Sequence, residues 1–281
     1  MNCSHPTRTL LTAVFVAIAC AHHIAAAQPP APLTIDTVVE KLQANLDAYD
    51  KSIPSFMADE HMDSIRHEFG NRGASAPNYE TIADSVFELK RQIDPATHSQ
   101  FLDESREMRI IDGRPADGRR INAPAMLYGA FSGGLAVVSS EEQACMHYQL
   151  EPPKPRKPII VRFTSTPAGE RPKTCLLAED GSGRVLIDPA SMQITHIEIR
   201  VPHHVITPEF DDGQKGAPQI THWEVLVDYR PVVLNNRIFW LPSTVSSTMS
   251  SDVTQWSFRA SYRNYHLLEV HSRIVLPEET K

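Results

Sequence analysis

Glycine is scarce in this chain, and the motifs that depend on it are missing. The sequence has 12 Gly against 22 Pro, a balance that favours turns between strands over glycine-rich loops that cradle phosphate. It contains neither a P-loop nor a dinucleotide-binding fingerprint. The stretch 129–133 places its serine one position too late for a nucleophile elbow. Asn71 stands where a zinc-protease motif beginning at His67 needs its second histidine.

An excess of positive charge is also missing. The formal net charge is −7, and no basic stripe with interleaved aromatic residues follows the chain, which argues against a nucleic-acid partner. No stretch beyond the N-terminal segment is apolar for long enough to span a bilayer. The sequence therefore predicts no nucleic-acid binding and no transmembrane segment.

The first 27 residues have the order of a secretory signal peptide. Arg8 precedes an apolar stretch over 10–21, and Ala25-Ala26-Ala27 offers a cleavage site before Gln28. The alternative without export is a weakly ordered N-terminal tail. We expect a signal peptide over 1–27 and an exported or periplasmic protein.

A second processing route would start from Cys20. A lipid attached there would anchor the protein, although Ala17 stands where lipoprotein signals usually carry Leu. By either route, the rest of the chain shows no internal repeat and no low-complexity linker. We therefore predict a single domain over 28–281.

The predicted mature chain contains a single pair of cysteines. Cys145 and Cys175 remain, and in an exported protein an even number of cysteines indicates a disulfide. A metal site or a reactive thiol is the alternative, but neither residue has a C-x-x-C partner. We predict that the two residues are bonded.

Two helices are expected. Apolar residues recur at helical spacing from Ile35 to Tyr49, with Thr34 as the N-cap and Asp36 in the first turn. The segment 123–138 is small and apolar and favours a second helix or helical loop, interrupted near its two glycines.

Most of the remaining sequence alternates with the period of β-strands. Asn235-Asn236, Asp180–Gly183 and Asp188–Ala190 are typical of tight turns between strands. We predict an α+β, mainly β, fold: a single curved antiparallel sheet, or unclosed β-barrel, with helices covering the concave face. The expected strands are 56–69, 82–93, 101–111, 145–150, 159–165, 173–179, 183–188, 192–201, 219–230, 236–245, 254–263 and 265–275.

Candidate catalytic and metal-binding groups lack a supporting pattern. Carboxylates such as Asp59, Glu60, Asp63, Asp103 and Glu104 could form an acid/base pair, but such spacings are common on solvated strands. Four histidines in the C-terminal half could bind zinc, yet nothing fixes a third ligand, and we interpret them as solvated surface residues. They are His196, His203, His204 and His222. We predict no catalytic residue, no metal and no cofactor.

Aromatic and aliphatic residues of the C-terminal strands fall on one face. They either fill a core between sheet and helix or line a cavity for an apolar ligand. The cavity candidates are Trp223, Val225, Val227, Tyr229, Trp240, Trp256, Phe258 and Tyr262, joined by Met126 and Phe131 of the second predicted helix.

Several stretches resemble one family of exported bacterial proteins. They are 183–189 (GRVLIDP) followed by 194–198, then 227–232 (VDYRPV), 239–242 (FWLP) and 104–113. Together they resemble the outer-membrane lipoprotein-sorting proteins, LolA/LolB-like, and their uncharacterised exported relatives. The resemblance implies an unclosed barrel covered by helices and binding of acyl chains, and it supplies no catalytic residue. The chain departs from those carriers in its length, its cysteine pair and an insertion-like segment over 152–158.

The expected function is that of a non-enzymatic periplasmic carrier for a lipid, a lipoprotein acyl chain or another apolar ligand. Burying acyl chain contributes about 0.8 kcal/mol per CH₂, so an apolar surface suffices without catalytic groups. The main alternative is an envelope scaffold or sensor with a filled core and a protein partner. An exported hydrolase with an unrecognised site is a third. Ligand, partner and oligomeric state stay open.

Overall fold

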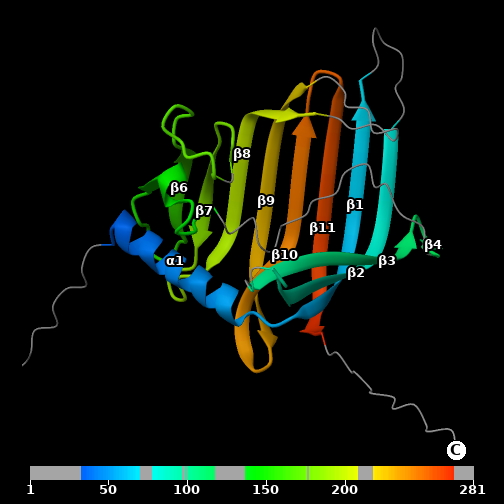
Figure 1. Ribbon diagram of the computed structural model, residues 1–281, viewed down its shortest axis with the longest axis horizontal. Coiled ribbons are helices and arrows are strands. Elements are labelled where there is room, and N and C mark those ends of the chain that lie inside the picture. The colour runs from blue at the N-terminus through cyan, green and yellow to red at the C-terminus, as the bar shows by residue number, and fades with distance from the viewer. Residues whose placement is uncertain are drawn as a thin grey trace, which may run out of the picture. The chain divides into compact units, whose positions relative to one another are not determined.

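A computed structural model describes residues 33–69, 78–96, 98, 100–117, 137–175, 177–207 and 218–268, all within one compact unit that begins at Leu33. The elements, coloured along the chain in Figure 1, are α1 (Ile35–Ser52), β1 (Phe56–Glu68), β2 (Asn78–Ile93), β3 (Gln100–Ile111), β4 (Arg114–Pro115), the 3-10 helix η2 (Gln143–Cys145), β5 (Met146–Leu150), β6 (Ile159–Ser165), β7 (Ser182–Ile187), β8 (Ile194–Ile206), β9 (Gln219–Leu234), β10 (Arg237–Ser250) and β11 (Thr254–Leu267). No helix in these ranges is long and apolar enough to cross a membrane.

The helix α1 begins where the sequence predicts. The Thr34 side chain accepts a hydrogen bond from the Thr37 backbone N–H, and the Thr37 hydroxyl accepts one from the Thr34 backbone N–H. Together they satisfy backbone donors at the open helix end. Asp36 in the first turn and Lys51 in the last complement the helix dipole. The apolar stripe of α1 is buried and consists of Val38, Val39, Leu42 and Leu46.

The strands form one open antiparallel sheet. Its eleven strands follow the order β4-β3-β2-β1-β11-β10-β9-β8-β7-β6-β5, so its two edges, β4 and β5, do not pair with each other. β1 pairs with β11 and joins the first strand of the unit to the last. In Figure 1, β2 and β3 bend so that one end of each runs toward α1. The prediction of a mainly β, unclosed sheet is confirmed.

The helical cover matches the prediction only in part. α1 is the one α-helix among the residues described, whereas two helices were expected. The second predicted segment, 123–138, lies outside the described residues except for Val137 and Val138, which belong to a turn and are fully buried.

One predicted strand is wrong. Residues 173–175 and 177–179 belong to a loop between β6 and β7, so Asp180–Gly183 leads out of that loop and is not a hairpin turn. The two strands predicted over 254–263 and 265–275 are continuous at residue 264, because β11 runs through Asn264, which takes a positive φ of 56°, and residues 269–275 lie outside the described residues. The turn at Asn235-Asn236 is confirmed: both residues have positive φ, as a two-residue hairpin requires.

One face of the sheet carries the core. Alternate residues of β1, beginning at Phe56, are buried through Ser64, and a similar alternation holds on β6, on β9 and on β11, whereas β8 and β10 each contain successive buried residues. We call the face bearing these buried residues the inner face and the opposite face the outer face. The stripe of α1 belongs to the same core cluster as the inner face.

Candidate ligand-binding face

The register of the central strands brings the predicted cavity residues together in rows. Val227 of β9 lies opposite Val245 of β10, which lies opposite Ala260 of β11. The two adjacent rows are Val225, Ser247 and Phe258, and Trp223, Met249 and Trp256. Strand alternation therefore gathers these side chains on the inner face, as the sequence predicts.

Burial differs across this group. Val227 is fully buried, whereas Trp223 and Trp256 are partly exposed, and the Trp223 indole N–H donates to the Ser247 hydroxyl at 3.0 Å. Val225, Tyr229, Phe258 and Tyr262 are buried, and Trp240 is partly exposed. Met126 and Phe131 lie outside the described residues. The assignment of these residues to a ligand cavity stays a prediction.

A small cavity of about 30 Å³ lies between α1 and the sheet. The helix contributes Leu42, Leu46 and Tyr49, and the sheet contributes Tyr229 and Trp240. Its remaining lining comes from Asn45 and from Met192, Gln193 and Ile194 before and at the start of β8. This volume has room for only about two water molecules, so α1 packs closely against Tyr229 of β9 and Trp240 of β10.

Two of the tyrosines that line this cavity have hydroxyls without a hydrogen-bond partner among the described residues. The hydroxyl oxygens of Tyr49 and Tyr229 are buried and have no hydrogen bond among the residues described. Burial raises the pKa of both phenols, and the nearby Glu104 carboxylate raises both pKa values further. An unsatisfied buried hydroxyl costs about 1–3 kcal/mol, so the pair marks a place where a hydrogen-bond acceptor would be favourable. The sequence indicated Tyr49 only as an apolar helix position.

A buried ion pair interrupts the apolar inner face near β1 to β3. The Arg106 Nε donates to both carboxylate oxygens of Glu60, at 2.9 and 2.8 Å, and the Ser85 hydroxyl donates to the same carboxylate at 2.6 Å. The Arg106 guanidinium also lies 5.2 Å from the centre of the Phe87 ring. Burial alone would lower the pKa of Arg106, but the Glu60 carboxylate raises it, and the net pKa is raised. The expectation that Glu60 is solvated is wrong, since it is 1% exposed.

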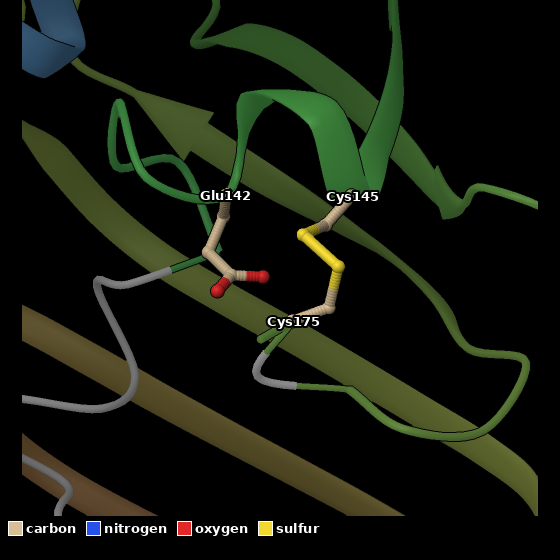
Figure 2. A group of neighbouring side chains, drawn as sticks. All are labelled: Glu142, Cys145 and Cys175. Atoms are coloured by element: carbon tan, nitrogen blue, oxygen red, sulfur yellow. A yellow bond between two sulfur atoms is a disulfide. The ribbon is translucent and has the colours of Figure 1, made fainter. Parts of the chain in front are cut away.

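The predicted disulfide is confirmed. Cys145 and Cys175 are bonded, with their Cα atoms 5.7 Å apart, and the Glu142 carboxylate lies beside them (Figure 2). These three residues form the one group of candidate metal ligands close enough together in the described parts of the chain. Because both sulfurs are committed to the disulfide, they cannot act as thiolate ligands.

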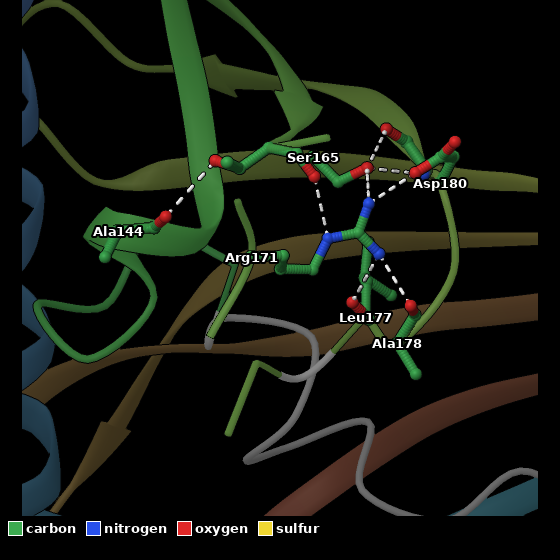
Figure 3. A network of polar contacts seen from close by, with 8 residues as sticks. Ala144, Ser165, Arg171, Leu177, Ala178 and Asp180 are labelled. Atoms are coloured by element: carbon green, nitrogen blue, oxygen red, sulfur yellow. Dashed lines mark hydrogen bonds and ion pairs between the residues drawn. The ribbon is translucent and has the colours of Figure 1, made fainter. Parts of the chain in front are cut away.

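Arg171 organises the loop that carries the disulfide. Its buried guanidinium donates to the backbone carbonyls of Thr166, Leu177 and Ala178 and pairs with Asp180 (Figure 3). A loop with buried carbonyls needs such donors, and one arginine supplies several of them. No motif in the sequence indicated this role.

Some of the histidines pair with carboxylates of a neighbouring strand or loop. His61 bonds Asp84 and His196 bonds Asp228, each at 2.7 Å between Nδ1 and a carboxylate oxygen. His204 bonds Glu179 at 3.1 Å, whereas His203 and His222 are exposed. Of the four histidines expected at the surface, His196 and His204 are thus partly exposed and paired with carboxylates.

Comparison with known proteins finds similarity to solved structures. Its sequence matches no protein-family model and no curated protein. The fold is similar to that of a putative outer membrane lipoprotein-sorting protein domain from Vibrio parahaemolyticus, with 12% identity and a TM-score of 0.33 over 82% of this chain and 92% of that one. It is also similar to MucB in its complex with MucA(peri), with 10% identity and a TM-score of 0.19 over 80% and 93% of the two chains.

Proposed function

We propose that this protein is an exported, non-enzymatic binding or carrier protein for an acyl-chain ligand, with α1 as the cover of the ligand site. The observation that carries the proposal is the pair of buried phenols, Tyr49 on α1 and Tyr229 on β9, beside one small cavity and without partners among the described residues. An acyl carbonyl would accept hydrogen bonds from both hydroxyls. The hydrocarbon tail would follow the aromatic and aliphatic rows of the inner face.

The electrostatics favour a neutral head group. Besides burial, Asp50 and Glu104 raise the pKa of Tyr49 while Arg91 lowers it, and Glu104 also raises the pKa of Tyr229, so the negative charge of Glu104 acts on both phenols. A free carboxylate placed between them would meet that charge, whereas an ester or amide carbonyl would not. The proposed ligand is therefore an acyl ester or acyl amide rather than a free fatty acid.

Binding requires α1 to separate from the sheet, because the cavity of about 30 Å³ is far smaller than an acyl chain. The C-terminal end of α1 is held by Arg91, whose side chain donates to the carbonyls of Asp50 and Ile53. Also in the C-terminal half of α1, the Asn45 side chain donates to the Met192 carbonyl at 2.7 Å. We expect the helix to open from the N-terminal end, about the segment that joins it to β1.

The test pairs binding with stability in Tyr→Phe variants. Tyr49→Phe and Tyr229→Phe remove the donors, so each should weaken binding of a fluorescent acyl methyl ester by about three- to tenfold. Each variant should unfold no more easily than the parent, because the hydroxyl it loses is unsatisfied. The free acid of the same probe should bind more weakly than the ester.

Tyr148→Phe is the matched control. The Tyr148 hydroxyl donates to the Val137 carbonyl at 2.7 Å, away from the cavity, so this variant should lose stability and keep its affinity for the ester. Unchanged ester binding in both Tyr49→Phe and Tyr229→Phe would contradict the proposal.

A scaffold with a filled core is the second candidate, and exposed apolar residues favour it. Val205 and Ile220 lie opposite each other at the end of β8 and β9 with exposed fractions of 49% and 65%. Phe69, just after β1, donates its backbone N–H to the carbonyl of Val253, just before β11, and both side chains are exposed. Such residues suit a protein partner. This function predicts no ester binding, and loss of partner binding when Ile220 is changed to Ser.

A further inference from the structure

The outer face of β5 to β8 holds a hollow that is separate from the inner-face site. Its volume is about 380 Å³, and it opens to solvent at the edge of the sheet. We propose that this hollow binds a phosphate group on a hydroxylated ligand, either a soluble phosphate ester or the head group of a phospholipid.

The hollow follows from the lengths of side chains in two neighbouring rows. One row across the strands contains Thr164 and Ser182, with Arg200 beyond them. The next row contains Arg162 and Arg184, also directly opposite each other. Short hydroxyl side chains between long arginines leave a depression with a hydroxyl floor and guanidinium walls. His147 and Gln149 of the edge strand β5 complete the rim.

Carboxylates hold the arginines in place. Arg184 donates through Nε to Glu198 at 2.6 Å, and Arg200 pairs with both Glu198 and Glu224. Arg162 donates through Nε to Glu151 at 2.6 Å. Glu198 alone of these three carboxylates lines the hollow, against three guanidinium groups. The lining itself therefore carries more guanidinium groups than carboxylates, while Glu151 and Glu224, which lie outside it, balance the charge from behind and keep its side chains oriented.

Several guanidinium donors stay available. Nη1 of Arg162, both Nη atoms of Arg184 and Nη1 of Arg200 have no acceptor among the residues described. Guanidinium groups match the geometry of phosphate oxygens and bind them through paired, charge-assisted hydrogen bonds. Donors from three strands suit a group with several oxygens, and the hydroxyls of Thr164 and Ser182 can exchange hydrogen bonds with ligand hydroxyls.

Calorimetric titration with glycerol 3-phosphate at low ionic strength tests the proposal, with glycerol as the uncharged comparison. Vesicles of phosphatidylglycerol, set against phosphatidylcholine, test the lipid source of the same chemistry. We expect saturable binding of glycerol 3-phosphate or of phosphatidylglycerol vesicles, and none of glycerol. The probe that binds identifies the source.

Variants separate the hollow from general charge attraction. Arg184→Gln should weaken binding at least about tenfold, because it removes charged donors to the phosphate. Thr164→Tyr keeps every charge but fills the floor, and it should weaken binding as strongly. Arg162→Gln has only the Glu151 pair to lose, so it provides a second test if Arg184→Gln folds poorly. Arg259→Gln, exposed on the same face outside the hollow, should bind as the parent does.

Two results would overturn the proposal. One is the absence of saturable binding by both phosphate probes. The other is an equal loss of affinity in Arg259→Gln and Arg184→Gln, or full affinity in Thr164→Tyr, because binding would then follow net charge and not the hollow.

Discussion

Glu60 and Arg106 carry opposite charges in an otherwise largely apolar part of the inner face. Removing two charges from water costs several kcal/mol per ion, and only good geometry with additional hydrogen bonds offsets that cost. Here Nε of Arg106 donates to both oxygens of the carboxylate, and Ser85 satisfies the carboxylate further. Each member is therefore stabilised by the other, and the loss of one should be far more damaging than the loss of both.

Glu60→Gln should lower the free energy of unfolding by about 3–5 kcal/mol, because Arg106 keeps its charge inside the fold without the carboxylate. The control is Glu107→Gln, which removes an exposed pair with Arg109 and should change stability by less than about 0.5 kcal/mol. Replacing both members together, Glu60→Leu with Arg106→Met, should recover most of the loss. Urea unfolding measures all three, and a loss below about 1 kcal/mol in Glu60→Gln would contradict the account.

The buried tyrosines predict a steep loss of stability at high pH. In the folded protein, burial raises the pKa values of five tyrosines and is the largest cause for each of them. They are Tyr49, Tyr148, Tyr229, Tyr262 and Tyr265. Above about pH 10, the unfolded chain releases phenol protons that the folded chain keeps. Stability is therefore fully present below about pH 10 and should fall by about 1.4 kcal/mol per pH unit for each such tyrosine.

Alkaline titration measures this behaviour directly. Tyrosinate absorbance from the buried phenols should appear together with the loss of β-sheet circular dichroism, in one transition. Ionisation of these five tyrosines at about pH 10 with the sheet intact would show that the phenols are accessible and would count against the description of the inner face.

Single residues also mark where prediction from sequence stops. Alternation along β1 already placed Glu60 in line with Phe56, Ala58 and Met62, but its charge suggested solvent. The partner that makes burial tolerable, Arg106, lies 46 residues away in the chain. Likewise, the helical spacing around Tyr49 indicates a side chain that faces the core. That its hydroxyl has no partner depends on how α1 meets β9, which sequence does not reveal.

At the scale of elements, the loop between β6 and β7 shows how a short pattern misleads. Cys175 and Leu177 alternate as in a strand, and Leu177 is buried. The carbonyls of this segment are, however, bound by Arg171 and not by a neighbouring strand. Longer patterns are more reliable: β6 has the predicted bounds, and α1 begins at the predicted cap.

The disulfide should stabilise this loop measurably. It joins residues 30 positions apart, so the chain-entropy model predicts a contribution of about 3–4 kcal/mol. We expect the Cys145→Ala, Cys175→Ala double variant to lose about that amount in urea unfolding. The matched experiment is reduction of the parent protein, which should reach the same stability.

Arg171 should hold the same loop independently of the disulfide. Because its hydrogen bonds do not involve the cysteine sulfurs, the loop should keep its conformation when the disulfide is absent. Free-thiol titration of the unreduced, denatured protein should find no thiol from Cys145 or Cys175. Two titratable thiols would contradict the disulfide itself.

At the scale of the whole described unit, the sheet is built mostly from neighbours in sequence, with one distant pairing. Strands that follow each other along the chain pair from β5 to β11, and two of these connections, at Asp188–Ala190 and at Asn235-Asn236, had turn signals in the sequence. The pairing of β1 with β11 has no such signal, because nothing local records which distant strand completes a sheet. It is also the pairing that unites the N-terminal strands with the C-terminal ones in a single inner face.

Val227 tests how full this inner face is. Because the residue is fully buried, Val227→Ala should leave a cavity and cost about 1–3 kcal/mol. Val227→Trp should overpack the same site and destabilise the fold by about 1–3 kcal/mol or more. Thermal or urea unfolding of both variants gives the answer. Full tolerance of the tryptophan would show a roomy cavity at this position, contrary to the closed packing around Val227.

The central claim is that the inner face beneath α1 holds an acyl ester or amide with its carbonyl at Tyr49 and Tyr229. Native mass spectrometry of the protein purified from its own cell envelope tests this claim most directly. The account predicts a population heavier by the mass of an acyl ester or amide, which is depleted in the Tyr49→Phe, Tyr229→Phe double variant and retained in Tyr148→Phe. A protein that carries no lipid mass, or a lipid retained equally by all three forms, would contradict it.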